Sequence, residues 1–130
     1  MGEQENSQAV QEFVAALEAG DPAQLGPLFE KHTADDFVQE WPQSGERIRG
    51  KANAMAINEN YPDMPKAKLR GVRGAGDVWV ADYELDYPEQ GRFFGVSIFE
   101  FRDGKVVKET DYFSQPFEAP EWRSKWVEKM

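Results

Sequence analysis

The chain has 130 residues, a length that suits one domain with a single hydrophobic core. Its 24 acidic residues outnumber its 15 basic ones, and the net charge of -9 argues against binding to nucleic acid or to anionic membranes. It contains no Cys, which excludes disulfides, thiolate metal sites and cysteine nucleophiles. The opening MGEQENSQ has no signal-peptide pattern and no segment approaches ~20 apolar residues, so we expect a soluble, cytoplasmic protein.

The first half of the chain predicts three short helices and two strands. One helix carries an apolar stripe at Val10, Phe13, Val14 and Leu17 and ends at Gly20. A second is capped by Asp21, has Pro22 at its first position and buries Leu25, Leu28 and Phe29. A strand is expected over 36–41, then a turn and a short return strand to Gly50, and then a helix over 51–61.

From Lys66 onward the pattern predicts four antiparallel strands. Their sequences are AKLRGVRG, DVWVADYELDY, GRFFGVSIFEF and KVVKETDYF, and the turns between them are GAG, PEQG and RDG. A last helix is expected from Pro120, with Trp122, Trp126 and Met130 on one side, so that the tryptophans hold it against the domain. This order predicts an α+β domain over residues 1–130, with a cone-shaped, curled, mixed or antiparallel sheet and helices on its concave side.

Two acids share one face of the last strand. Side chains alternate along a strand, so Glu109 and Asp111 point the same way as Val107 and Phe113. Same-face neighbours lie ~6.5–7 Å apart, a spacing that suits a general acid and a general base acting on one substrate. Crowded carboxyl groups do not all ionise readily, so one of them would keep a proton near neutral pH.

The element order, together with EWPQSGERIRG, DGKVV and ETDYFSQPFEAPEW, resembles the nuclear transport factor 2-like superfamily and its SnoaL-like members. The resemblance covers nearly the whole chain. It implies a pocket on the concave face of the sheet and a homodimer through the convex face. Because this fold hosts isomerases, cyclases, dehydratases and epoxide hydrolases as well as proteins without catalysis, the resemblance alone does not fix an activity.

The closest local similarity is to limonene-epoxide hydrolase, whose last strand carries a catalytic Asp within an Asp-Tyr-Phe run. Asp111 holds that position here, which implies that it points inward. Asp82 and Glu84 stand where the hydrolase has an Arg and an Asp, so an acid replaces the Arg and places the hydrolase triad in doubt. Glu40 corresponds roughly to its water-holding Asn, and Ser97 lies near the oxyanion-hole Asp of ketosteroid isomerase.

In this register one concave face combines carboxylates with aromatic rings. Its members are Val80, Asp82, Glu84, Ser97, Phe99, Glu109, Asp111 and Phe113, with Glu40 nearby. The alternative register reverses the earlier strand, so that Trp79, Ala81, Tyr83 and Leu85 form the core and Asp82 and Glu84 face solvent.

These residues predict a small-molecule pocket. We assign general acid or base catalysis to Asp111, tuned by Glu84 and Asp82, and ligand binding to Glu40, Trp41, Tyr61, Ser97, Phe99, Glu109 and Phe113. The substrate would be apolar and cyclic or carbonyl-bearing, converted by an isomerase, cyclase or hydrolase that needs no cofactor. The alternative is a non-catalytic ligand-binding or dimerisation module of the same fold.

The only histidine, His32, follows the second predicted helix. Its interaction with the dipole at the helix end is the ordinary explanation, and catalysis is the alternative. Without a second His or any Cys we expect no transition-metal site, although a carboxylate site for Mg²⁺ remains open.

Overall fold

The computed structural model describes residues 2–20 and 22–130, with Pro22 described by its backbone alone. Helix α1 (Glu3–Ala19) begins earlier than the apolar stripe predicts and ends as expected, with Gly20 in the left-handed conformation at φ 67°. The Gly20 N–H donates to the Leu17 carbonyl at 3.1 Å. The expected cap at Asp21 lies outside the described residues.

The next two helices also follow the predicted order. A 3-10 turn, η1 (Pro22–Gln24), leads into α2 (Leu25–His32), which buries Leu25 and Phe29. Helix α3 (Lys51–Glu59) buries Ala54 and stops two residues before the expected end. Prolines at positions 62 and 65 keep the following chain out of helical conformation.

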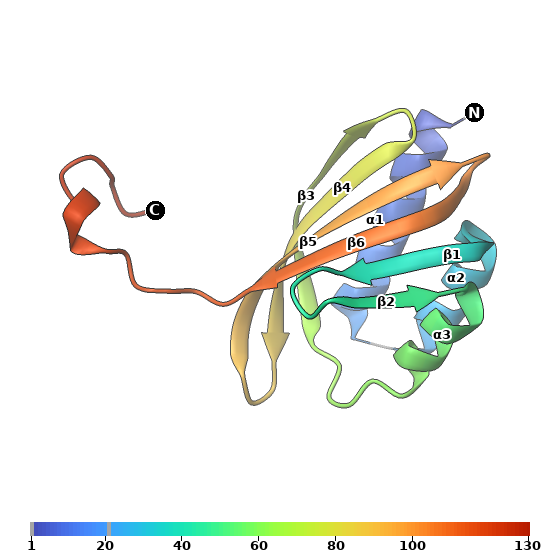
Figure 1. Cartoon of the computed structure of the whole chain (residues 1–130), viewed down its shortest axis with the longest axis horizontal. Coiled ribbons are helices and arrows are strands. Elements are labelled where there is room, and N and C mark those ends of the chain that lie inside the picture. The colour runs from blue at the N-terminus through green and yellow to red at the C-terminus, as the bar shows by residue number, and fades with distance from the viewer. Residues whose placement is uncertain (1, 21) are drawn as a thin grey trace.

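The sheet contains six strands within the described residues: β1 (Thr33–Trp41), β2 (Glu46–Arg49), β3 (Lys66–Ala75), β4 (Val78–Tyr87), β5 (Gly91–Arg102) and β6 (Lys105–Ser114). Their order is β2-β1-β6-β5-β4-β3, and only the β1–β6 pair is parallel. The sheet is therefore mixed, which is one of the two arrangements predicted. Figure 1 shows how strongly it curls.

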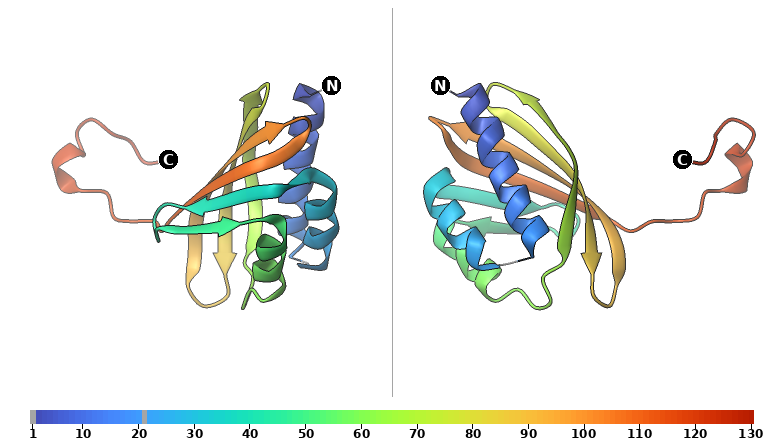
Figure 2. Two further views of the ribbon diagram at one scale, coloured as in Figure 1. Left: turned by 45° about the vertical axis from the view of Figure 1, so that its right-hand side comes forward. Right: turned by 180° about the vertical axis from the view of Figure 1, so that it is seen from behind.

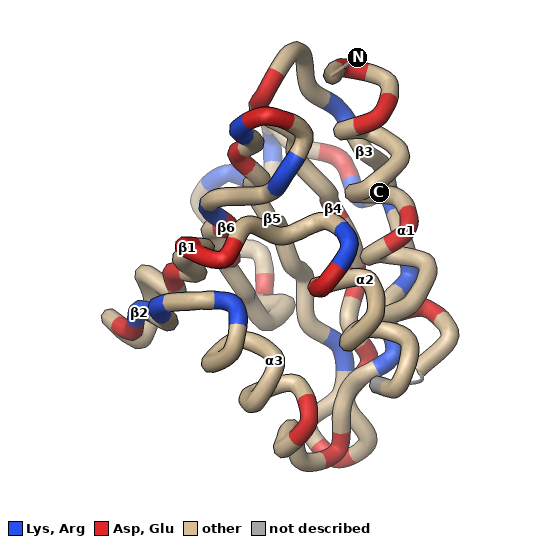
Figure 3. The backbone as a smooth tube through the Cα atoms, turned by 90° about the vertical axis from the view of Figure 1, so that its right-hand side faces the viewer, with Lys and Arg blue, Asp and Glu red and all other residues tan. Residues whose placement is uncertain are grey.

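The three α-helices of the described residues cover the concave face of the sheet, which confirms the predicted α+β architecture. Helix α1 packs along β3 and β4, while α2 and α3 lie against β1. Figure 2 shows these helices on one side of the sheet, and Figure 3 shows them in front of the strands. Phe13 stacks on Phe99 of β5 and meets Phe29 edge-on, so rings from α1, α2 and the sheet form one core.

The predicted C-terminal helix is wrong. After Ser114 the chain is extended and forms only the 3-10 turn η2 (Glu121–Arg123). Trp122 and Trp126 are 74% and 77% exposed and do not hold the segment against the domain. Short helices are marginal in water unless an apolar face packs, and here the apolar residues have no surface of their own chain beneath them. No helix among the described residues is long and apolar enough to span a membrane.

Candidate functional site

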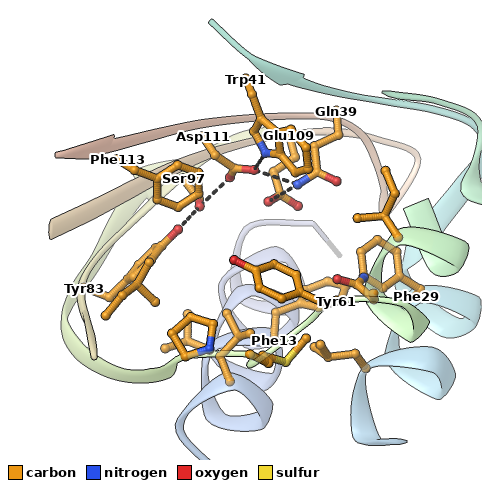
Figure 4. Close-up of a pocket in the computed structure, with 18 of the residues that line it drawn as sticks. Phe13, Phe29, Gln39, Trp41, Tyr61, Tyr83, Ser97, Glu109, Asp111 and Phe113 are labelled. Atoms are coloured by element: carbon orange, nitrogen blue, oxygen red, sulfur yellow. Dashed lines mark hydrogen bonds between the residues drawn. The ribbon is translucent and has the colours of Figure 1, made fainter. Parts of the chain in front are cut away.

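An aromatic pocket opens on the concave face between the sheet and the helices. Its volume is about 120 Å³, comparable with the ~150 Å³ engineered cavity that admits benzene. Helices α1 and α2 supply apolar side chains, and the sheet supplies the carboxyl groups and most of the other polar side chains (Figure 4). The described lining residues include two carboxyl groups, those of Glu109 and Asp111, and no Lys, Arg or His.

The lengths of the β-turns decide which side chains face this pocket. Tyr87 pairs with Gly91 across a three-residue turn, so odd-numbered residues of β4 oppose odd-numbered residues of β5. Tyr83 therefore lies opposite Gly95, and Ser97 lies opposite both Ala81 and Asp111. On the parallel side of β6, Gln39 is the register partner of Glu109.

This register overturns the expected placement of Asp82 and Glu84. Both project from the convex face, where Asp82 pairs with Arg73 at 3.5 Å and Glu84 with Arg92 at 3.6 Å. Val80 also lies on the convex face and not on the expected concave one. The buried residues of β4 are Trp79, Ala81, Tyr83 and Leu85. The alternative register is thus correct for β4, although Glu109 and Asp111 do point inward from β6.

Glu40 and Val107 also depart from the expected face. Glu40 alternates outward from β1, where Arg47 donates to it at 2.8 Å and Lys108 lies 3.4 Å away. Its neighbours Gln39 and Trp41 face the pocket instead. A bulge between β5 and β6 makes Val106, not Val107, the buried residue at the start of β6.

The remaining expected residues come together. The pocket is lined by Trp41, Tyr61, Ser97, Phe99, Glu109, Asp111 and Phe113. The sequence analysis did not identify Gln39, Tyr83 and Tyr87, which also line it. The turn at residues 88–90 carries the signal that would have placed Tyr83, because its three-residue length fixes the pairing of β4 with β5.

Asp111 is the most firmly held polar group of the pocket. It is 3% exposed and accepts three hydrogen bonds: from Ser97 Oγ at 2.6 Å, from Gln39 Nε2 at 2.6 Å and from Trp41 Nε1 at 2.9 Å. Because Ser97 donates to the carboxylate, its oxygen is left to accept from the Tyr83 hydroxyl, which lies 2.6 Å away. Figure 4 shows this chain of hydrogen bonds along the pocket wall.

Glu109 lies beside Asp111 and accepts fewer hydrogen bonds. It accepts from Gln39 Nε2 at 3.2 Å, so one amide bridges the two carboxyl groups. Burial, followed by the neighbouring Asp111, raises the pKa of Glu109 well above its ordinary value of 4.5. Burial and the same Asp111 charge also raise the pKa of Tyr83, so its phenol remains protonated.

Gly95 makes room for the Tyr83 ring. A Cβ at position 95 would overlap that ring, and Tyr83 could then no longer lie across β5 toward Ser97. The glycine therefore belongs to the site, although it carries no functional group.

Two tyrosines close the mouth of the pocket. The Tyr61 hydroxyl, just beyond α3, lies 3.0 Å from the Tyr87 hydroxyl at the end of β4. Burial, and then the contact with Tyr61, raises the pKa of Tyr87. A surface hollow of about 300 Å³ shares Trp41, both tyrosines and Phe113 with the pocket, so the two adjoin at this point.

His32 lies away from the pocket. It is the last residue of α2, and its Nε2 lies 3.1 Å from Glu12 Oε2. Its pKa is lowered chiefly by burial, and the Glu12 charge acts in the opposite direction. Among the described residues, no group of three or more His, Cys, Asp or Glu is arranged to hold a metal ion.

Comparison with known proteins finds relatives that align with nearly the whole chain. Residues 10–109 match the SnoaL-like domain family. The chain is 39% identical to an NTF-2-like protein of unknown function from Burkholderia xenovorans LB400, with a TM-score of 0.84 and coverage of 98% of this chain and 96% of that one. No curated protein matches the chain.

Two further solved structures share the fold. A putative ketosteroid isomerase from Kribbella flavida DSM 17836 is 24% identical, with a TM-score of 0.85 over 98% of this chain and 91% of that one. An LEH-like epoxide hydrolase from M. tuberculosis is 22% identical, with a TM-score of 0.68 over 86% and 84%. The predicted resemblance is confirmed: the chain belongs to the SnoaL-like family and has the nuclear transport factor 2-like fold.

Proposed function

We propose that the pocket binds a small, largely apolar molecule and exchanges a proton with it through the Glu109–Asp111 carboxyl pair. The observation that carries this proposal is the placement of two adjacent carboxyl groups in an aromatic cavity without a basic residue among its described lining. Crowded carboxyl groups in a poorly hydrated site share protons, which supplies an acid and a base at neutral pH. Such an isomerase, cyclase or hydrolase needs no cofactor.

The hydrogen bonds suggest different roles for the two acids. Asp111 receives three donors, which hold it in one position on the pocket wall. Glu109 receives one long hydrogen bond, and its pKa is raised. We therefore assign proton transfer to Glu109. Asp111 helps to position the Glu109 carboxyl group through Gln39, and its negative charge disfavours the ionisation of Glu109. This reverses the emphasis of the sequence-based assignment, in which Asp111 was the general acid or base.

The lining of the pocket favours a particular substrate class. Rings from both the helices and the sheet enclose a volume comparable with cavities that admit one six-membered ring. An anionic substrate would meet two carboxyl groups and no counter-charge. A neutral cyclic ketone or alcohol would place its oxygen against the protonated Glu109 and its ring against Phe13 and Phe99.

The named reactions of structural neighbours support this class without selecting one reaction. They include a putative ketosteroid isomerase, a putative SnoaL-like polyketide cyclase from Jannaschia and an LEH-like epoxide hydrolase. The hydrolase triad is not supported here, because Asp82 and Glu84 lie on the opposite face of the sheet and no Arg lines the pocket among the described residues.

A binding module without catalysis is the alternative, and it would use the same pocket. We also propose that two copies pair through the convex sheet face, as the resemblance implies. Half-buried apolar residues run along the middle of that face, at Val80, Phe94, Val96 and Ile98. Acidic and basic side chains that form salt bridges surround these residues. A surface with charges of both signs suits a self-complementary contact between two copies.

Deuterium exchange tests the catalytic proposal without knowledge of the natural substrate. Cyclohexanone is incubated with the protein in D₂O, and loss of the hydrogens next to its carbonyl is followed by proton NMR. We expect exchange above the buffer rate, a fall of at least tenfold in Glu109→Gln, and no change in the convex-face control Glu84→Gln. Binding of cyclohexanone without any exchange would support the binding module instead.

A further inference from the structure

The segment after β6 leaves the domain altogether. Residues 115–130, here called the C-terminal arm, follow Ser114 and extend away from the sheet. Figures 1 and 2 show that the arm and the three helices lie on opposite sides of the sheet. The arm therefore projects on the side of the convex face.

The arm exposes large apolar side chains. Phe117 is 82% exposed, Trp122 74% and Trp126 77%, and Val127 and Met130 are exposed as well. Two turn hydrogen bonds, from Ser124 and Trp126 N–H, and the Arg123 contact with Trp122 all form within the arm. Several solvent-exposed aromatic side chains in one segment are typical of a segment that packs against a second protein surface.

Coverage shows that the arm is not peculiar to this chain. The SnoaL-like match ends at residue 109. The alignments with the Burkholderia and Kribbella structures span 98% of the 130 residues, which leaves at most three outside, so both run into the arm.

The convex face offers a matching surface on the same side. Its half-buried apolar strip is flanked by Tyr112 and Val78, which are 44% and 49% exposed. The twelve residues from Gln115 to Trp126 reach up to ~40 Å when extended, whereas a sheet of six strands is about 24 Å wide. The arm is long enough to cross a neighbouring sheet.

Charge favours a second copy of this chain as the partner. The whole chain carries -9, which would keep nucleic acid and anionic membranes away from the arm. The arm itself is balanced, with three acidic and three basic residues: Glu118, Glu121, Glu128, Arg123, Lys125 and Lys129. The convex face also carries both signs, so acidic side chains of one copy can face basic side chains of the other.

We propose that the C-terminal arm is exchanged between two copies, so that Phe117, Trp122 and Trp126 of each copy pack on the convex sheet face of the other. A two-fold axis between the convex faces places each arm beside the partner, and both contacts form together. This inference rests on the proposed pairing of convex faces and is independent of the chemistry in the pocket.

Light scattering coupled to size-exclusion chromatography, over a dilution series, tests the exchange. Four proteins are compared: the full chain, a chain ending at Ser114, Trp122→Ser/Trp126→Ser, and the matched arm variant Lys125→Ser. We expect a dimer for the full chain and for Lys125→Ser, and a dissociation constant raised at least tenfold for the other two. Acrylamide quenching of tryptophan fluorescence should increase as the full chain is diluted through its dissociation constant.

Two results would overturn the proposal. If the shortened chain and the double variant dimerise as tightly as the full chain, the convex faces pair without the arm. If the full chain is a monomer at all concentrations and its tryptophans stay equally accessible, no second copy receives the arm. The double substitution lies outside every strand. A circular dichroism spectrum like that of the full chain would show that the double variant is folded, so that either result reports on association.

Discussion

Ser97 and Asp111 lie directly opposite each other on β5 and β6, and the serine hydroxyl donates to Asp111 Oδ1 at 2.6 Å. The same hydroxyl accepts from Tyr83, also at 2.6 Å. One small side chain therefore links the phenol on β4 to the carboxylate on β6. The polar groups of the pocket are held as one network and not as separate residues.

Replacing Ser97 by Ala should destabilise the protein by about 1–3 kcal/mol, because it leaves the Tyr83 hydroxyl and Asp111 Oδ1 buried without this partner. Urea denaturation measures the change. Ser114→Ala, at the exposed end of the same strand pair, is the control and should stay within ~0.5 kcal/mol of wild type. Equal stability of the two variants would show that the network contributes nothing.

The titration of Glu109 should make the free energy of unfolding decrease as pH rises. Its pKa is raised in the folded protein, so above pH 4.5 the folded state binds more protons at this site than the unfolded state. This contribution is fully present below 4.5 and is lost as pH rises through the folded-state pKa. The slope for one proton reaches about 1.4 kcal/mol per pH unit.

Urea denaturation between pH 4.5 and 8.5 measures that slope. We expect Glu109→Gln to remove it, so that the variant gains stability over wild type as pH rises. Glu84→Gln, on the convex face, should keep the wild-type slope. Parallel curves for wild type and Glu109→Gln would mean that Glu109 titrates normally.

Replacing Gly95 by Ala should destabilise the protein by about 1–3 kcal/mol and weaken ligand binding, because the new methyl group overlaps the Tyr83 ring. Gly26→Ala in α2 is the matched control, since its Cβ would meet nothing within 4 Å and Ala favours the helix. Thermal unfolding and cyclohexanone titration report the two effects. A Gly95→Ala protein as stable as Gly26→Ala would contradict the close approach of Tyr83.

Removing the Tyr61 hydroxyl should open the mouth of the pocket. Tyr61→Phe breaks its contact with Tyr87, so we expect a several-fold faster dissociation of bound cyclohexanone, with a smaller effect on stability. NMR line-shape analysis measures the rate. Tyr112→Phe, on the outer side of β6, provides the comparison. Identical rates in both variants would show that the tyrosine pair does not control entry.

Preference among ligands follows from the charge of the pocket. Cyclohexanone and cyclohexanol should bind more tightly than cyclohexanecarboxylate at pH 7, because the carboxylate meets Glu109 and Asp111 without a basic partner. Thermal shifts with all three compounds test the order. Strongest binding by the carboxylate would contradict the proposed substrate class.

The sequence was enough to predict the element order as far as β6, because apolar spacing and turn residues act locally. Gly20 ended α1 where expected, and the turns separated the four long strands. The face of each strand was harder to predict. Alternation gives two faces but does not say which is buried, and Asp82 and Glu84 were assigned to the wrong one because the pairing set by the PEQG turn was not used.

The C-terminal segment could not be predicted from its own pattern. Trp122 and Trp126 have helical spacing, yet a helix of that length persists only if its apolar face finds a surface. Spacing does not reveal whether that surface belongs to the same chain. Similarly, Gln39 and Tyr83 became visible as site residues only once neighbouring strands brought them beside Asp111 and Ser97.

A carbon-13 NMR titration of the glutamate side-chain carboxyl groups tests the central claim most directly, with the Glu109 signal assigned by its loss in Glu109→Gln. The proposed mechanism predicts that Glu109 keeps its proton at a pH at which exposed glutamates are ionised, and that its signal shifts when cyclohexanone binds. If Glu109 ionises together with the exposed glutamates and its signal does not respond to the ketone, it is not the proton donor of this pocket.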